Sequence, residues 1–213
     1  MPRVKVKICG ITNWPDARCA VEAGADFLGF NFYRPSPRYI SPAKARAIIR
    51  RLPRGIGAVG VFVNEPDESM RKIARAAGLD FLQLHGDETP ELVAQLRATL
   101  PVIKAVRVRD GFRPAQLVRF RRASAFLLDG FDSRRHGGTG KTFNWELARS
   151  AGSRRRIFLA GGLTAENVAE AIRMARPYAV DVCSGVESRP GRKDPARISA
   201  LMDAVKSTRR RNR

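Results

Sequence analysis

The sequence predicts an α/β protein, a single (βα)8 TIM barrel that spans residues 1–213. Short β-rich runs alternate with segments of helical spacing along the chain, a pattern typical of parallel strands joined by crossover helices. The eight strand–helix units follow one another without a linker, which favours one closed barrel. The segment AGADFL at 23–28 also recurs as AGLDFL at 77–82, two units later. A doubly wound open sheet is the alternative, but no G-x-G-x-x-G follows the first strand.

Each predicted strand is a short apolar or β-branched run bounded by turn residues or charges. The first strand alternates strictly: Val4, Val6 and Ile8 occupy one face, and Lys5, Lys7 and Cys9 the other. We expect the apolar face to pack on the helices and the other face to point into the barrel. The strands are predicted at 4–9, 27–32, 58–63, 81–85, 102–108, 125–129, 157–160 and 179–183.

Each predicted helix begins at a residue suited to a first turn. Proline opens several of them, and Thr89 and Thr164 precede two others as N-cap candidates. Gly24 and Gly78 suit the left-handed C-caps that end helices before a strand. The helices are predicted at 15–23, 42–51, 68–77, 90–98, 114–121, 145–150, 165–175 and 195–207.

The chain carries 40 basic and 20 acidic residues, a formal net charge of +20, which raises nucleic acid as a partner. The basic residues are spread along the chain, however, and no aromatic stacking motif or zinc knuckle accompanies them. We therefore expect a solvated basic surface that attracts small anionic substrates, with no specific nucleic-acid partner. Residues 207–213 are expected to form a frayed basic tail.

Cys9, Cys19 and Cys183 are the three cysteines, an odd number without metal-ligand spacing. They favour free thiols in a reducing cytoplasm and argue against a disulfide framework or a metal site. The sequence shows no apolar run of membrane-spanning length and no secretory signal near its start. We expect a cytoplasmic protein with no membrane association.

In a barrel of this kind, the active site lies where the strands end at their carboxyl side. Cys9 ends the first strand, where nearby Lys5 and Lys7 would lower the pKa of its thiol; the alternative is an inert core cysteine. Asp129 ends the sixth strand, where a carboxyl group serves either as an acid or as a structural loop cap.

The fourth and eighth strands add further polar groups. Gln83 and His85 share one face of the fourth strand and are expected to line the site. Asp181 should lie in the barrel beside the first strand, because strands one and eight are neighbours when a barrel closes. We therefore predict an ion pair of Asp181 with Lys5 or Lys7.

Three glycine-rich stretches follow late strands, and glycine lets backbone N–H groups approach an anion. Phosphate sites after strands seven and eight recur in this fold, so we expect a phosphate group there. The candidate phosphate-binding residues are Gly138, Gly140, Gly161, Gly162, Ser184 and Gly185. A ligand held by these loops would lie between Asp129 and Cys9, which suggests isomerisation by proton transfer.

Two other readings stay open on the residues alone. A barrel such as a pentose-phosphate epimerase would usually need metal ligands, and the sequence offers only His85 and His136 with no ligand cluster. The other alternative is a nucleic-acid-binding protein built on an enzyme fold that has lost its activity. Such a protein would not need Cys9, Asp129 and the glycine loops together, which argues against it.

In combination and order, the motifs resemble those of the phosphoribosylanthranilate isomerase family over nearly the whole chain. They are KICGIT (7–12), SPRYI (36–40), GVFVN (60–64), LQLHG (82–86), LD (128–129), GTGKTFNW (138–145), LAGGL (159–163), DVCSGVE (181–187), PG (190–191) and KD (193–194). The family usually has Ser-Ser-Gly after the eighth strand, so Cys183 is a departure that would weaken one side-chain contact to the ligand.

The resemblance implies a cofactor-free Amadori rearrangement of N-(5-phosphoribosyl)anthranilate to 1-(2-carboxyphenylamino)-1-deoxyribulose 5-phosphate in tryptophan biosynthesis. It implies that Asp129 is the general acid and Cys9 the general base, and that Arg38 holds the anthranilate carboxylate. Gln83, His85 and Asp181 are taken as further substrate-binding residues. The partner expected is a small phosphoribosyl substrate, with the protein a monomer or a homodimer.

Overall fold

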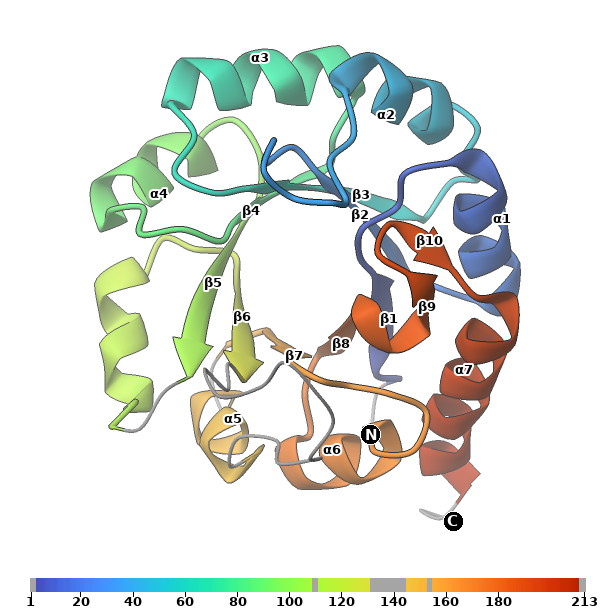
Figure 1. Ribbon diagram of the computed structural model, residues 1–213. Helices are drawn as coiled ribbons and strands as arrows, with labels where there is room; N and C mark the ends of the chain where they lie inside the picture. Colours follow the sequence, from blue (N-terminus) through green and yellow to red (C-terminus); the bar gives the residue numbers. More distant parts are fainter. Residues whose placement is uncertain (1–2, 109–110, 131–144, 153–154, 211–213) are drawn as a thin grey trace.

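The computed structural model describes residues 3–108, 111–130, 145–152 and 155–210. Eight parallel strands form a closed barrel in the order β1-β2-β3-β4-β5-β6-β7-β8, and helices surround it (Figure 1). The fold class predicted from the alternation is confirmed. The barrel strands are β1 (Lys5–Ile8), β2 (Phe27–Asn31), β3 (Gly57–Phe62), β4 (Phe81–Leu84), β5 (Val102–Val108), β6 (Ala125–Gly130), β7 (Ile157–Ala160) and β8 (Ala179–Val182).

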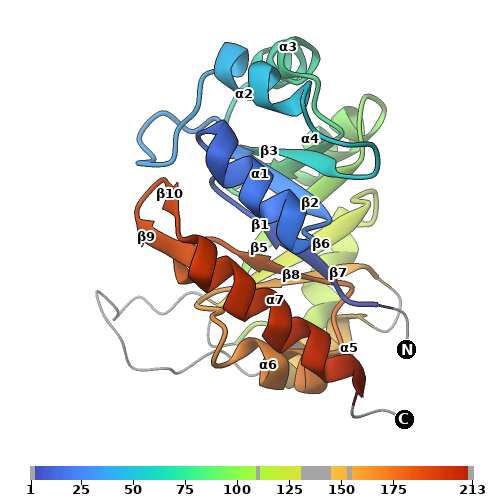
Figure 2. The same cartoon turned by 90° about the vertical axis from the view of Figure 1, so that its right-hand side faces the viewer.

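All eight predicted helical segments are helical, with shifted ends and one different helix type. The segment after β5 is a 3-10 helix, and the last helix continues beyond residue 207, where fraying was expected, to Arg210. The helices are α1 (Trp14–Ala23), α2 (Pro42–Ile49), α3 (Asp67–Ala77), α4 (Pro90–Arg97), the 3-10 helix η1 (Pro114–Phe120), α5 (Trp145–Gly152), α6 (Val168–Ala175) and α7 (Pro195–Arg210). Figure 2 shows α7 on the outside of the barrel beside α1.

Local sequence signals account for most helix ends. Thr89 caps α4 as predicted, and Gly24 and Gly78 end α1 and α3 with φ of 103° and 77°. Thr164 is not the N-cap of α6, which is Asn167; the Thr164 backbone N–H donates to Asn167 Oδ1 at 2.9 Å in the turn that precedes the helix. This turn delays the start of α6 to Val168.

A short antiparallel hairpin follows β8 and was not predicted. After the 3-10 turn η2 (Ser184–Val186), β9 (Glu187–Arg189) pairs with β10 (Arg192–Lys193). Gly191 has φ of 78°, a value that glycine adopts readily, and provides the turn. Figure 1 shows this hairpin beside β1 at the mouth of the barrel.

The core has two layers, one between strands and helices and a smaller one inside the barrel. Rings from the strand starts fill the interior: Phe27 lies 5.6 Å from Phe81 and 5.4 Å from Phe158, measured between ring centroids. The Lys5 ammonium lies 5.4 Å above the Phe27 ring. Because aromatic side chains occupy the amino-terminal end of the barrel, the polar groups gather at the opposite end. None of the described helices is long and apolar enough to cross a membrane.

Candidate active site

A cavity of about 270 Å³ lies where the barrel strands end at their carboxyl side. Its walls bring together side chains and loops from seven of the eight strand ends, all but that of β5. Ten of the predicted site residues line it: Cys9, Arg38, Gln83, His85, Asp129, Gly161, Gly162, Asp181, Ser184 and Gly185. The two others, Gly138 and Gly140, lie outside the described residues. Every described residue of the predicted site therefore lies at this one cavity.

Cys9 follows β1 directly, and its backbone N–H donates to Val182 O at 2.9 Å, which anchors it to β8. A hydrogen bond from the Cys183 thiol lowers the pKa of Cys9 well below that of an ordinary thiol. Burial opposes this effect, and the charge of Lys7 reinforces it. The structure thus favours a thiolate at this strand end.

Lys7 forms a buried ion pair with Asp181. Its Nζ lies 2.9 Å from both carboxylate oxygens, and its side chain is fully buried. The predicted ion pair is confirmed with Lys7 as the partner, whereas Lys5 lies over an aromatic ring. Burial raises the pKa of Asp181 to about 6, although Lys7 opposes the shift. Burial lowers the pKa of Lys7, but the charges of Asp181 and Cys9 outweigh it and raise the pKa above its usual value.

Asp129 is linked to the fourth strand through His85. The Asp129 Oδ2 atom lies 3.3 Å from His85 Nε2, and His85 Nδ1 lies 3.0 Å from Gln83 Nε2. The Asp129 and His85 side chains are 29% and 24% exposed, so both reach the cavity. The Gln83 Oε1 atom is buried and has no hydrogen-bond partner among the described residues.

Arg38 lies against the hairpin that the sequence analysis missed. Its Nε donates to Glu187 Oε1 at 2.9 Å and its Nη2 to Glu187 Oε2 at 2.6 Å. The Lys193 Nζ atom also lies 2.9 Å from Glu187 Oε1. Burial raises the pKa of Glu187, but hydrogen bonds from Arg38 and Lys193 outweigh burial and lower it overall. Glu187 is therefore a charged anchor that orients Arg38 at the cavity.

Asn31 is another cavity residue that sequence reasoning missed. Its Oδ1 accepts from the Tyr33 N–H at 2.9 Å, and its Nδ2 donates to Ser36 Oγ at 3.1 Å. The Arg38 N–H also donates to Ser36 Oγ, at 3.1 Å. Asn31 therefore shapes the loop that presents Arg38. A polar residue near the end of the apolar run 27–32 was the available signal.

Gly161 and Gly185, in the loops after β7 and β8, pack against backbone with no room for a side chain. A Cβ on Gly185 would lie 2.0 Å from Leu163 O, and a Cβ on Gly161 would lie 2.5 Å from Gly130 N. Gly161 and Gly162 also have φ of 95° and 64°. These glycines allow three strand-end loops to approach one another and leave open backbone along the cavity.

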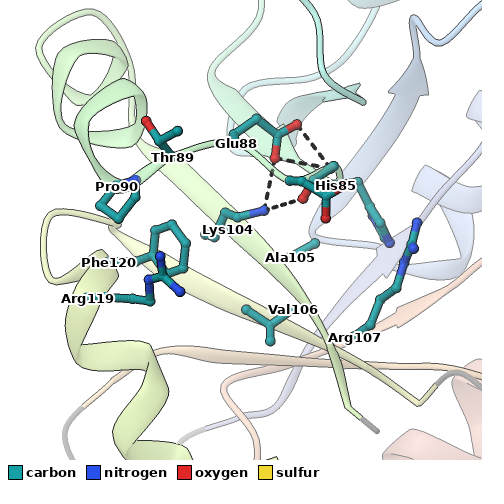
Figure 3. A pocket seen from close by; sticks show the side chains of 12 residues that line it. His85, Glu88, Thr89, Pro90, Lys104, Ala105, Val106, Arg107, Arg119 and Phe120 are labelled. Carbon is teal, nitrogen blue, oxygen red and sulfur yellow. Dashed lines mark hydrogen bonds and ion pairs between the residues drawn. The ribbon is translucent and has the colours of Figure 1, made fainter.

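A larger cavity of about 460 Å³ adjoins the site at His85, which borders both (Figure 3). Figure 3 shows the Lys104 ammonium beside the Glu88 carboxylate, and the two are 2.9 Å apart. Glu88 Oε1 also accepts from the N–H groups of Asn64 and Gly86, each at 3.0 Å. These buried contacts hold the turn after β4, which fixes His85 at the cavity border.

No group of three or more His, Cys, Asp or Glu side chains that could hold a metal ion occurs within residues 3–108, 111–130, 145–152 and 155–210. The acid–base groups of the cavity are two thiols, carboxyls and an imidazole. A cavity with such groups on opposing strand ends and with glycine loops beside it is suited to proton transfer on a small anionic substrate. Fold and site together define the class as a TIM-barrel acid–base enzyme.

Similarity to known proteins identifies a family within this class. The family model "N-(5'phosphoribosyl)anthranilate (PRA) isomerase" matches residues 6–204. The N-(5'-phosphoribosyl)anthranilate isomerase of Pelobacter propionicus is 52% identical over 206 residues, which cover 97% of each chain. That of Moorella thermoacetica is 54% identical over 204 residues, 95% of this chain and 90% of the relative. The chain belongs to the phosphoribosylanthranilate isomerase family and is an isomerase.

Solved structures agree with this assignment. The phosphoribosyl anthranilate isomerase of Thermotoga maritima superposes with a TM-score of 0.89 at 45% identity, covering 96% of this chain and 99% of that one. A further phosphoribosyl anthranilate isomerase was solved in complex with reduced 1-(o-carboxyphenylamino)-1-deoxyribulose 5-phosphate. It superposes with a TM-score of 0.85 at 43% identity, over 96% of this chain and 99% of that one.

Proposed function

We propose that the protein converts N-(5-phosphoribosyl)anthranilate to 1-(2-carboxyphenylamino)-1-deoxyribulose 5-phosphate in tryptophan biosynthesis, with Asp129 as general acid and Cys9 as general base. The observation that carries the proposal is that both residues line one cavity together with the glycine loops after β7 and β8. The family relatives and the product-analogue complex of a relative support the substrate. The rearrangement needs no cofactor.

Asp129 acts first, in its carboxylic acid form, by protonating the ribose ring oxygen so that the ring opens to a Schiff base. His85 Nε2 lies 3.3 Å from Asp129 Oδ2, and Gln83 Nε2 lies 3.0 Å from His85 Nδ1, so these two side chains position the Asp129 carboxyl at the cavity.

Cys9 acts second, as a thiolate that removes the proton from C2 of the Schiff base. The resulting enolamine tautomerises to the ketone. The Lys7 ammonium stabilises the thiolate electrostatically and is itself held by Asp181. Because Cys9 follows β1 and Asp129 ends β6, the substrate lies between them across the mouth of the barrel.

The substrate's anionic groups bind at the cavity margins. Backbone N–H groups near Gly161, Gly162 and Gly185, with the Ser184 hydroxyl, bind the phosphate, and Gly138 and Gly140 complete the set. Arg38 binds the anthranilate carboxylate, with Glu187 fixing the guanidinium. Gln83, His85 and Asp181 contact the sugar. The protein acts in the cytoplasm as a monomer or a homodimer, without a specific nucleic-acid partner.

The test follows the fluorescence of freshly prepared phosphoribosylanthranilate after addition of purified protein in the presence of EDTA. We expect rapid decay with the wild type, and a rate lower by about 10²–10⁴-fold for Cys9→Ala and for Asp129→Ala. Cys19→Ser, a change in α1 away from the cavity, is the matched control and should retain wild-type turnover. Near-normal turnover in either alanine variant, with the fold intact, would remove that residue from its proposed role.

A further inference from the structure

Cys183 is a thiol of the cavity to which the proposed rearrangement assigns no proton transfer. It follows β8 directly, as Cys9 follows β1, and both thiols are partly exposed along the cavity. The Cys183 side chain lies 3.9 Å from Glu187 Oε1 and 4.0 Å from Lys193 Nζ, measured from Sγ. A thiol in this position has chemistry available that a serine hydroxyl lacks.

Strand register places the two cysteines next to each other. Ile8 pairs with Val182 between the parallel strands β1 and β8, and Cys9 and Cys183 are the next residues on each side. Neighbouring strands lie about 4.8 Å apart, which is within the roughly 4.4–6.8 Å between Cα atoms that a disulfide spans. The influence of Cys183 on the pKa of Cys9 is consistent with this proximity.

Two glycines leave space around these sulfur atoms. A Cβ on Gly29 of β2 would lie 2.6 Å from Cys9 Sγ. A Cβ on Gly10 would lie 3.1 Å from Cys183 Sγ. The absence of side chains at both positions leaves room for the two sulfur atoms at the cavity.

The surroundings favour oxidation of this pair. Lys7 and Lys193 place positive charge near Cys9, and the thiolate form reacts with peroxides. Cys183 stays a thiol, because its hydrogen bond to Cys9 and its burial raise its pKa. One sulfur is thus suited to react first with an oxidant, and the other is suited to resolve the product.

We propose that Cys9 and Cys183 form a reversible disulfide when the protein meets a hydroperoxide such as hydrogen peroxide. The Cys9 thiolate attacks one peroxide oxygen, and the O–O bond breaks. Hydroxide departs as the leaving group, and Cys9 becomes a sulfenic acid. The Cys183 sulfur then attacks that sulfur, and its proton leaves with the hydroxyl group as water. In sum, two thiols are oxidised to a disulfide and one peroxide is reduced to two water molecules.

The disulfide would remove the thiolate that accepts the substrate proton, so oxidation would switch the isomerase off. This consequence rests on the proposed role of Cys9, whereas formation of the disulfide does not. Reduction by a dithiol would restore both cysteines. Without Cys183, the sulfenic acid would lack a resolving thiol and would advance to the sulfinic acid, which thiols do not reduce.

The test treats the full-length protein with hydrogen peroxide, then with dithiothreitol, and compares wild type, Cys183→Ser, Cys183→Ala and Cys19→Ser. Peptide mass spectrometry should find a Cys9–Cys183 linked peptide in wild type and in Cys19→Ser. Both should lose activity by about tenfold or more and regain it with dithiothreitol. The two Cys183 variants should form no link, accumulate sulfinic acid at Cys9 and fail to recover activity relative to their own untreated samples.

The readouts separate two kinds of failure. Oxidation of Cys9 in wild type without a Cys9–Cys183 linked peptide overturns the proposed disulfide, as does full recovery of activity by both Cys183 variants. A linked peptide that forms while turnover persists instead overturns the role of Cys9 as the base. The use of both Ser and Ala at position 183 guards against one variant being misfolded.

Discussion

The Lys7 ammonium lies 2.9 Å from both oxygens of the Asp181 carboxylate, and both side chains are buried inside the barrel next to Cys9. The pair joins the first and last strands at the point where the barrel closes. The positive charge of Lys7 also acts on the Cys9 thiol and helps to lower its pKa. One contact therefore serves both the closure of the fold and the chemistry of the site.

Breaking this pair should destabilise the protein more than replacing it. Lys7→Met leaves a buried carboxylate without its partner, and we expect a loss of about 3–5 kcal/mol in the free energy of unfolding. Lys7→Met/Asp181→Leu removes both charges and should recover a large part of that loss. Urea unfolding of the wild type, both single variants and the double variant measures the coupling. Additive losses across this cycle would contradict a direct interaction.

Cys183 should set the pH at which the enzyme becomes active. The proposed base, Cys9, would act as a thiolate, so activity should be lost as pH falls through the pKa of Cys9, which the Cys183 hydrogen bond holds low. Cys183→Ala removes the donor, raises that pKa and should move the acidic limb of kcat/KM to higher pH. Cys183→Ser retains a hydroxyl donor and should shift the limb less. The measurement is a pH profile of kcat/KM under reducing conditions. An unchanged limb in Cys183→Ala would contradict this coupling.

Arg38 should matter for substrate affinity more than for the proton transfers. Arg38→Lys keeps the charge but loses the planar pair of N–H groups that binds a carboxylate. We expect KM to rise by about 10–100-fold, the range of one charge-assisted hydrogen bond, with a smaller change in kcat. Glu187→Gln should raise KM in the same direction, because Glu187 holds the guanidinium at two positions. Steady-state kinetics of the two variants measure KM and kcat. A fall in kcat with KM unchanged would contradict the proposed role of Arg38 in substrate binding.

Gly185 should be intolerant of any side chain. A Cβ there would lie 2.0 Å from Leu163 O, so Gly185→Ala must push apart the loops after β7 and β8. We expect about 1–3 kcal/mol of destabilisation and a raised Ki for inorganic phosphate as a competitor. Gly152→Ala is the control, since its Cβ would meet Ile157 Cγ1 at an ordinary 3.5 Å. Equal behaviour of the two variants would contradict the tight packing.

Much of the candidate site could be predicted because a parallel barrel places the carboxyl ends of its strands at one end. Cys9, His85 and Asp129 each end an apolar run, so their meeting follows from the strand boundaries alone. The Lys7–Asp181 pair follows from barrel closure in the same way. Helix caps such as Thr89 were also predictable, because a cap depends only on residues within one turn.

Other contacts could not be predicted because they depend on loop conformation. The hairpin of β9 and β10 brings Glu187 to Arg38 across 149 positions, and its short strands carry no alternation to mark them. The delayed start of α6 likewise depends on a turn closed by Asn167. In both cases, side-chain hydrogen bonds decide the backbone path.

The sequence by itself determined the barrel, its strand order and the polar residues at its mouth, because these follow from alternation and local turn chemistry. Only the tertiary structure decided which of those residues touch. It chose Lys7 and not Lys5 for Asp181, since Lys5 lies among aromatic rings at the other end. It also brought Cys183 to Cys9, because contacts between the first and last strands are set by barrel register, and register arises only when all strands close together.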